Sequence, residues 1–278
     1  MTEPEYSTLS VNLRGGVATV TLDNPPVNLF DATLIGDLGQ AGQSLAEHAD
    51  VRVVVLESAN PEFFIAHADV ASIQRLPPPD QGGGELLAAF HQVVDRFRTM
   101  PKATIAKIEG RCRGGGSELA LACDMRFAAI GRAVLSQPEV GLGIIPGGGG
   151  STRLPRLVGR ARALEIILGC ADFDAALAER YGYVNRALPA DEIGAFVDEL
   201  AHRIASFPAE AIAMAKEVVA HGDDGLEETL AVEREVFVCS AHTDAAKRRM
   251  AAAMSLGLQT APVETAGFDQ FWRSLPES

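Results

Sequence analysis

The sequence predicts an α/β fold followed by a helical region. In the first half of the chain, short apolar segments with strand character alternate with segments of helical periodicity. Beyond Pro146 the strand signals fade and helical patterns dominate. With 278 residues, 47% of them hydrophobic, the chain is long enough to bury one large core.

The N-terminal half begins with a predicted β-hairpin. Apolar and polar residues alternate across 17–22, and an apolar segment at 9–13 precedes them with the turn signal Arg14-Gly15-Gly16. The segments that follow are helix, strand, helix, strand, helix and strand, at residues 34–49, 51–56, 86–100, 103–108, 118–123 and 125–129. Parallel strands joined in this way have right-handed crossovers.

The C-terminal third is predicted to be a helical appendage. Its helical patterns lie at residues 161–168, 191–207, 209–221, 226–239 and 245–256. Residues 259–278 form a tail, which we expect to dock only if Phe268, Phe271 and Trp272 find a groove.

Composition excludes several function classes. A formal net charge of -13 argues against binding to nucleic acid or anionic membranes, which requires clustered Lys and Arg. The four cysteines, at positions 112, 123, 170 and 239, have no spacing typical of a zinc site and are expected to be reduced. The polar N-terminus lacks a signal core and no segment has the length of a membrane span, so we expect a cytoplasmic protein.

A glycine-rich turn at Gly114-Gly115-Gly116 separates a strand from a helix that carries Glu118. Consecutive glycines allow close approach of the backbone. The unpaired N–H groups at the start of a helix can hold an oxygen that acquires negative charge, which is half of an oxyanion hole. The alternative is that the glycines serve only tight packing.

A second stretch, residues 137–150, places Glu139 in a loop before another glycine-rich turn. It superficially resembles a phosphate-binding loop, but Gly150 is followed by Ser-Thr-Arg without the required lysine, which excludes nucleotide triphosphate hydrolysis. A third stretch, residues 63–70, places Asp69 as the N-cap of a short helix.

These stretches together resemble the enoyl-CoA hydratase/isomerase (crotonase) superfamily over roughly residues 5 to 258. The resemblance is carried by four separated motifs: Pro26-Val27-Asn28-Leu29, Ala66-His67-Ala68-Asp69-Val70, Gly114-Gly115-Gly116-Ser117-Glu118, and Gln137-Pro138-Glu139 with Ile145-Pro146-Gly147. It implies a crotonase-like spiral of repeated β-β-α turns with a C-terminal helical oligomerisation region. The implied divisions are a core with the acyl-CoA site at 1–200, a helical region at 201–258 and a tail at 259–278.

By motif match, the resemblance implies that Glu118 and Glu139 are catalytic and that the N–H groups of Ala68 and Gly115 form the oxyanion hole. The residues implied to contact substrate are Val27, Leu29, Ala66, His67, Asp69, Val70, Gly114 and Pro138. His67 stands where the family usually has glycine. Its imidazole is open to three interpretations: it narrows the pocket, it touches the CoA moiety, or it points to solvent.

Hydration of a 2-enoyl-CoA thioester to a 3-hydroxyacyl-CoA is the predicted reaction, because two carboxyl groups can activate water and protonate the α carbon. The alternatives are an isomerase, which in this family generally lacks the first carboxylate, another acyl-CoA-transforming crotonase, or a non-catalytic scaffold with the same fold.

The resemblance also implies a partner, an assembly and a place in fatty acid metabolism. The substrate is an acyl-CoA, and CoA enters only as part of it; no metal, flavin or nicotinamide cofactor is expected. Arg14, Lys102, Lys107 or C-terminal cations of a neighbouring subunit are candidates to bind the CoA phosphates. A homotrimer or hexamer is expected, with three apolar residues as interface candidates: Leu230, Val236 and Phe237.

Overall fold

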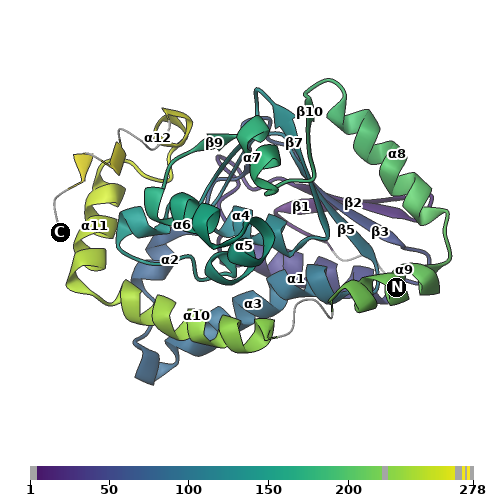
Figure 1. Cartoon of the computed structure of the whole chain (residues 1–278). Helices are drawn as coiled ribbons and strands as arrows, with labels where there is room; N and C mark the ends of the chain where they lie inside the picture. Colours follow the sequence, from purple (N-terminus) through teal and green to yellow (C-terminus); the bar gives the residue numbers. More distant parts are fainter. Residues whose placement is uncertain (1–4, 221–224, 267–270, 273, 276–278) are drawn as a thin grey trace.

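Two β-sheets and the helices around them form the structure, a computed structural model that describes residues 5–220, 225–266, 271–272 and 274–275 (Figure 1). The strands are β1 (Leu9–Arg14), β2 (Val17–Leu22), β3 (Val53–Ser58), β4 (Phe63–Ile65), β5 (Ala103–Ile108), β6 (Arg111–Arg113), β7 (Met125–Ile130), β8 (Val134–Ser136), β9 (Phe173–Asp174) and β10 (Arg186–Pro189). The predicted hairpin and the predicted strands of the first half are confirmed.

The helices are α1 (Ala32–Glu47), α2 (Val70–Gln74), α3 (Gly83–Thr99), α4 (Gly115–Ala122), α5 (Gly150–Val158), α6 (Arg160–Gly169), α7 (Ala175–Tyr181), α8 (Ile193–Ala205), α9 (Ala209–Ala220), α10 (Leu226–Ala241), α11 (Asp244–Ser255) and α12 (Ala261–Ala266), with the 3₁₀ turns η1 (Pro79–Gln81) and η2 (Glu139–Leu142). Among the described residues, none of the helices combines the length and the apolar character needed to cross a bilayer.

The larger sheet has the strand order β1-β2-β3-β5-β7-β10 and is parallel except for β1. Its central strands are buried on both faces, which explains their unbroken apolar sequences. Val54 and Leu56 face a core cluster shared with α1, α3 and α4, whereas Val53 and Val55 face a cluster shared with α8. The sheet is therefore covered by helices on both sides (Figure 1).

The smaller sheet has the order β4-β6-β8-β9 and explains the spiral. Three times in succession, a strand of the larger sheet is followed by a three-residue strand of the smaller one: β3 by β4, β5 by β6 and β7 by β8. A helical segment follows each pair. The predicted spiral of β-β-α turns is confirmed.

The segment beyond Pro146 differs from the prediction in one respect. It contributes two strands, β9 and β10, and β10 completes the larger sheet beside β7. Both strands are too short to show an alternation of apolar and polar residues, so the sequence did not indicate them. The boundaries at residues 200 and 258 stay predictions; α8 spans the first of them and packs on the larger sheet.

The C-terminal tail docks through the aromatic residues that the structure describes. Phe271 and Trp272 pack against a core cluster that includes residues of α10 and α11, and Trp272 Nε1 donates to the carbonyl of Cys170 at 3.1 Å. Phe268, the third aromatic residue of the predicted contact, lies outside the described residues. The tail thereby reaches the loop that carries Glu139, since Trp272 also contacts Gly141.

Candidate active site

A cavity of about 380 Å³ lies where α2, α3, α4 and the glycine turn of residues 147–150 meet. Its polar floor contains Glu118, Glu139 and the backbone of Ala68 and Gly115. Its walls are largely apolar and come from residues that the sequence did not single out for a site: Phe30, Ile35, Ile73, Leu76, Leu87, Phe90 and Phe237. Apolar walls around a few convergent polar groups are typical of a small-molecule site.

The backbone conformation at Gly114 and Gly116 places Glu118 on the polar floor of this cavity. Gly114 has φ +49°, which favours glycine, and a side chain on Gly116 would collide with Ile65 of β4. These two glycines let α4 begin against the smaller sheet, so that Glu118 is buried in the first turn of the helix. Its Oε1 accepts the N–H groups of Gly148 at 2.7 Å and Gly150 at 2.9 Å.

Glu139 begins the 3₁₀ turn η2 and is also buried. Its Oε1 lies against Gly114, where a side chain would come within 2.8 Å of it. Its Oε2 has no hydrogen-bond partner among the described residues. Since a buried polar atom without a partner is costly, this oxygen is available to a ligand in the cavity.

The two carboxyl groups differ in their electrostatic surroundings. Burial raises the pKa of both, and the charge of Glu118 raises the pKa of Glu139 further, to well above its usual value. The N–H groups of Gly150 and Gly148 favour the ionised form of Glu118 and partly offset its burial. Of the two carboxyls, Glu139 therefore holds a proton more tightly, and Glu118 ionises more readily.

The N–H groups of Ala68 and Gly115 lie side by side. A Cβ atom added to Gly115 would be 3.5 Å from the nitrogen of Ala68. Gly115 is the first residue of α4, where an N–H has no partner inside the helix. Within the described residues neither N–H group makes a hydrogen bond, and both residues line the cavity. Two backbone donors therefore lie close together in the lining of the cavity that also contains the two carboxyls.

The remaining predicted substrate contacts fall into three groups. Asp69 lines the cavity and caps α2, as predicted, through the N–H groups of Ala71 and Ser72. Three residues line a small adjoining cavity on the other side of Glu139: His67, Val70 and Pro138. Four line neither cavity, so their contact with substrate stays a prediction: Val27, Leu29, Ala66 and Gly114.

His67 does not point to solvent, so that interpretation of its role is wrong. Its side chain is 7% exposed and its Nε2 lies 2.9 Å from Glu264 Oε1 of α12. The interaction joins residues that are 197 positions apart, and neighbouring sequence carries no signal for it.

The predicted phosphate-binding cations lie away from the cavity lining. Arg14 pairs with Asp198 on the surface, Lys102 donates to the carbonyl of His48, and Lys107 pairs with Glu57. The cation that does line the cavity is Arg75, at the end of α2, with a side chain that is 71% exposed. Sequence reasoning missed it, because a single arginine after a short helix has no distinguishing pattern.

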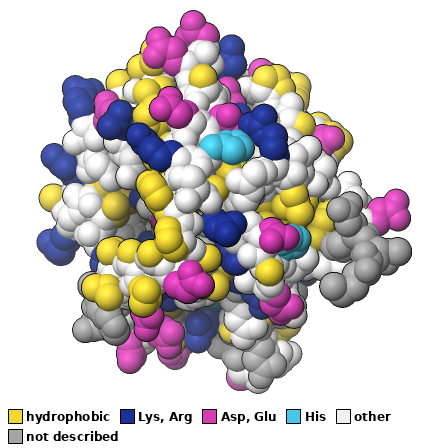
Figure 2. Space-filling view, turned by 90° about the vertical axis from the view of Figure 1, so that its right-hand side faces the viewer, with side chains coloured by type: hydrophobic (Ala, Val, Ile, Leu, Met, Phe, Trp, Pro, Cys, Tyr) yellow, Lys and Arg dark blue, Asp and Glu magenta, His cyan; other side chains and the backbone are white. Residues whose placement is uncertain are grey.

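Two of the three interface candidates pack inside the chain. Leu230 and Phe237 are buried, whereas Val236 is 46% exposed. Other exposed apolar side chains lie on α9 and α10: Met214, Val218, Val219 and Val232. Figure 2 looks at the side where α8 and α9 lie in Figure 1 and shows apolar side chains gathered in several places among interspersed charges.

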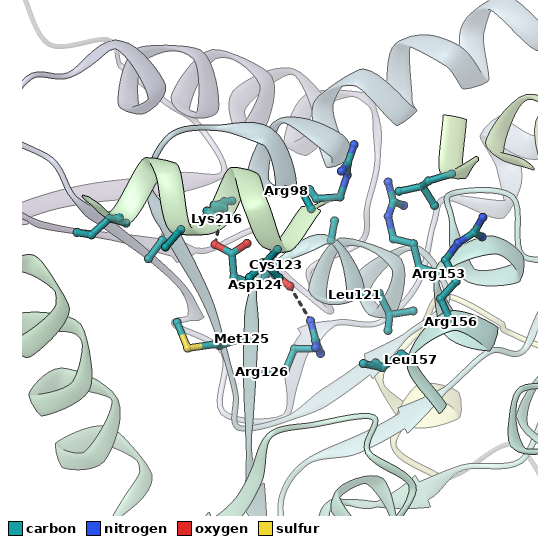
Figure 3. Close-up of a pocket in the computed structure, with 17 residues that line it drawn as sticks. Arg98, Leu121, Cys123, Asp124, Met125, Arg126, Arg153, Arg156, Leu157 and Lys216 are labelled. Atoms are coloured by element: carbon teal, nitrogen blue, oxygen red, sulfur yellow. Dashed lines mark hydrogen bonds and ion pairs between the residues drawn. The ribbon is translucent and has the colours of Figure 1, made fainter. Parts of the chain in front are cut away.

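A larger cavity of about 570 Å³ lies between α9 and α5 (Figure 3), and neither Glu118 nor Glu139 lines it. Its cations already have partners. Lys216 pairs with Asp124 at 2.8 Å, Arg126 donates to the carbonyl of Cys123 at 2.6 Å, and Arg153 pairs with Asp95 at 3.0 Å. Because these charged side chains already pair with other groups of the protein, the smaller cavity, where the convergent polar groups are, is the candidate active site.

A third buried carboxyl, Glu233 of α10, was not identified from the sequence. Its Oε1 accepts the N–H of Gly149 at 2.6 Å, so the glycine turn is held from one side by Glu118 and from the other by Glu233. Burial, with the charge of Glu118, raises the pKa of Glu233 to about 8. Several other glutamates lie on α10, and nothing in the sequence marks this one as buried.

We expect Glu233→Gln to change how stability depends on pH. The folded protein keeps a proton on Glu233 up to about pH 8, whereas the unfolded chain releases it near 4.5, so the wild type loses stability as pH rises through this window. The neutral variant does not have this loss. Thermal melts should give equal Tm values near pH 5 and a Tm several degrees higher for the variant near pH 9. A Tm difference that is the same at both pH values would contradict the buried proton.

Known proteins resemble this chain both in sequence and in structure. A family model described as enoyl-CoA hydratase/isomerase matches residues 12–256. A "probable enoyl-CoA hydratase" of Rhizobium meliloti is 37% identical over 89% of this chain and 95% of the relative, and the "short-chain-enoyl-CoA hydratase" of Clostridium acetobutylicum is 31% identical over 84% and 89%. The crystal structure of a "putative enoyl-CoA hydratase" from Streptomyces avermitilis superposes with a TM-score of 0.89 at 40% identity, covering 97% and 98% of the two chains.

Proposed function

The chain belongs to the enoyl-CoA hydratase/isomerase family, and on that basis we propose that it adds water to 2-enoyl-CoA thioesters to give 3-hydroxyacyl-CoA products. The observation that carries the proposal is the placement of two buried carboxyls, Glu118 and Glu139, on the floor of one apolar cavity beside two free backbone donors. Water addition needs a base, an acid and a site for a developing oxyanion, and we assign these roles to the two carboxyls and the two backbone donors.

Glu118 acts as the base in this proposal. Two backbone N–H groups on Oε1 support its ionised form, which leaves Oε2 to accept a proton from the attacking water. The water oxygen bonds to the β carbon as the proton passes to the carboxylate. The electron pair of the double bond moves toward the thioester carbonyl, whose oxygen becomes enolate-like.

Glu139 then supplies the proton at the α carbon. Its pKa lies well above the usual value because of burial and the charge of Glu118, so Glu139 is the carboxyl of the pair that carries the proton and acts as an acid when the enolate collapses. The enolate oxygen accepts the N–H groups of Ala68 and Gly115. The proton gained by Glu118 and the proton lost by Glu139 balance over the cycle, and exchange with water restores the pair.

The nearest alternative is double-bond isomerisation by Glu139 alone. The carboxyl of Glu118 favours hydration, because it is buried on the cavity floor and fixed by two hydrogen bonds, as a base for water requires. A non-catalytic scaffold would not need two buried carboxyls whose burial opposes ionisation.

The proposed reaction also bears on cofactors, cellular location and oligomeric state. The CoA moiety enters with the substrate, and no further cofactor is needed, since the thioester itself accepts the electron pair. We also propose a cytoplasmic enzyme of fatty acid metabolism that forms a trimer or hexamer. The exposed apolar residues of α9 and α10 support a subunit interface, and the mass of the particle in light scattering tests it.

A panel of 2-enoyl-CoA thioesters of increasing chain length tests the function. Loss of the conjugated enoyl absorbance with formation of 3-hydroxyacyl-CoA is expected for the wild type, and a Glu118→Gln, Glu139→Gln double variant serves as the blank. A shifted double bond without water addition would favour the isomerase. Absence of both turnover and acyl-CoA binding would favour the scaffold.

Arg75 is expected to bind a phosphate of CoA at the cavity mouth. Arg75→Ala should raise KM roughly threefold to tenfold and leave kcat nearly unchanged, because an exposed cation contributes modest, salt-screened binding energy. Arg14→Ala is the matched control, since Arg14 is equally exposed but lies outside the cavity lining. A KM effect in the Arg14 variant and none in the Arg75 variant would contradict this assignment.

A further inference from the structure

Four buried or half-buried charged groups meet behind the oxyanion site. Glu264 of α12 pairs with His67 at 2.9 Å and lies 3.5 Å from Arg113 Nη1. Arg113 also makes a bidentate pair with Asp172, at 2.7 and 2.5 Å. Side chains of His67, Arg113 and Glu264 are at most 7% exposed. Two cations and two anions therefore balance within one buried cluster, as a low-dielectric site requires.

The hydrogen bonds of the His67 ring require a proton on each of its nitrogens. Nδ1 lies 2.8 Å from the carbonyl oxygen of Ala68, which can only accept. Nε2 lies 2.9 Å from a carboxylate oxygen of Glu264, which also accepts when ionised. A neutral imidazole has one N–H and can make only one of these bonds. The geometry thus fits an imidazolium.

Phe30 and the His67 ring together hold the peptide groups on the two sides of Ala68. The carbonyl of His67 accepts the N–H of Phe30 at 2.9 Å, which turns the Ala68 N–H in the opposite direction, toward the cavity. The next peptide group, between Ala68 and Asp69, is held at both ends: its carbonyl accepts from the imidazole, and its N–H donates to the carbonyl of Phe30 at 3.3 Å. Loss of the imidazole contact would leave this peptide group held by its long N–H bond alone.

The segment around α12 also holds the other half of the oxyanion site. Arg113, two residues before Gly115, donates to the backbone carbonyl of Glu264 at 3.0 Å. Gln259 donates from its side chain to Asp69 at 3.0 Å and from its backbone to Glu264 Oε1 at 2.8 Å. Residues 259–264 therefore contact both chain segments that carry the two N–H donors.

We propose that Glu264 is a positioning residue for catalysis, which keeps His67 as an imidazolium and thereby fixes the Ala68 N–H against the Gly115 N–H for the oxyanion. The inference rests on the proposed hydration, because it assigns Glu264 a part in stabilising that reaction's enolate oxygen. Glu264 does not touch the substrate in this scheme and acts through His67.

The charges around His67 give the effect a pH dependence. The groups that face the ring are Glu264, Arg113 with its partner Asp172, and Glu139 across the small adjoining cavity. Burial lowers the pKa of His67, but the charge of Glu264 and the hydrogen bonds to Glu264 and Ala68 together outweigh burial, and the pKa lies above its usual value. The imidazolium contact is therefore complete below about pH 6.5 and is lost as pH rises through the raised pKa.

Glu264→Gln tests the proposal, with the exposed Glu235→Gln of α10 as matched control. The amide keeps the size of the side chain but removes the charge that keeps His67 protonated. At about pH 7 we expect kcat to fall roughly tenfold to a hundredfold with KM within about threefold, since displacing one oxyanion donor acts on the transition state. Near pH 5.5 the loss should be smaller, and Glu264→Asp should restore part of kcat at both pH values. Unchanged kcat at pH 7, or a loss independent of pH, would overturn the proposal.

Nitrogen NMR of the ¹⁵N-histidine-labelled wild type provides a test that needs no variant to be active. The His67 signals, assigned by their absence in His67→Gln, should show two protonated ring nitrogens at about pH 7. A neutral ring at that pH would overturn the inference. If the wild type hydrates no enoyl-CoA, the proposed function fails; if it does and Glu264→Gln matches it, only the positioning role fails.

Discussion

Glu118→Gln is expected to lower kcat for hydration by roughly 10²–10⁴, the range for loss of a positioned acid–base group. The amide oxygen can still accept the N–H groups of Gly148 and Gly150, so the glycine turn should keep its place. What the variant loses is the ability to take a proton from water. The measurement is kcat and KM on the best substrate of the enoyl-CoA panel, with KM expected to change little.

Glu233→Gln is the matched control for this loss. Glu233 is also buried and also accepts an N–H of the same glycine turn, but it does not line the cavity. The kcat of the Glu233→Gln variant should stay within about tenfold of the wild type, because the variant changes only a contact that holds the glycine turn. Near-normal activity in Glu118→Gln, or equal losses in both variants, would contradict the role of Glu118 as the base.

Gly115→Pro is expected to lower kcat by roughly 10²–10³ because it removes one of the two N–H groups proposed to hold the oxyanion. Gly115 is the first residue of α4, a position where proline is tolerated in a helix, since the N–H there has no intrahelical partner. The donor can therefore be removed without breaking the helix.

Gly115→Ala separates the lost donor from added bulk. A Cβ at this position lies 3.2 Å from Phe30 and 3.3 Å from the Cβ of Ala68, so both variants crowd the same neighbours. Only proline lacks the N–H, and its ring Cδ occupies the position of the amide hydrogen. The expected result is a much lower kcat for the proline variant than for the alanine variant, with melting curves of both to establish that they fold. Equal activity of the two would mean that the Gly115 N–H does not hold the reacting oxygen.

Prediction of the fold from the sequence succeeded for the long elements. β3 and β5 are apolar because helices cover both faces of the larger sheet, and this leaves a continuous run of apolar residues. The strands of the smaller sheet are mostly three residues long, and β6 consists of Arg111, Cys112 and Arg113. Such segments are too short to have a period, so the spiral was implied by family resemblance and confirmed by the strand order.

The part of the candidate site that could be predicted is the part where the local backbone conformation requires particular residues. Gly114 needs a positive φ and Gly116 a close approach to β4, and both demands leave glycines in the sequence next to Glu118. The apolar walls left no such trace, since Phe90 and Phe237 have helical spacing whether they face a cavity, a core or a partner.

The sequence by itself therefore determined the alternation of elements, the two glycine turns and the two glutamates that accompany them. Only the tertiary structure decided that Arg75 borders the cavity, that Glu233 is buried, and that Glu264 meets His67 from 197 positions away. The reason is physical: a backbone conformation constrains the residue that adopts it, whereas burial and ion pairing depend on which distant segments fold together, and any Glu or Arg can supply the charge.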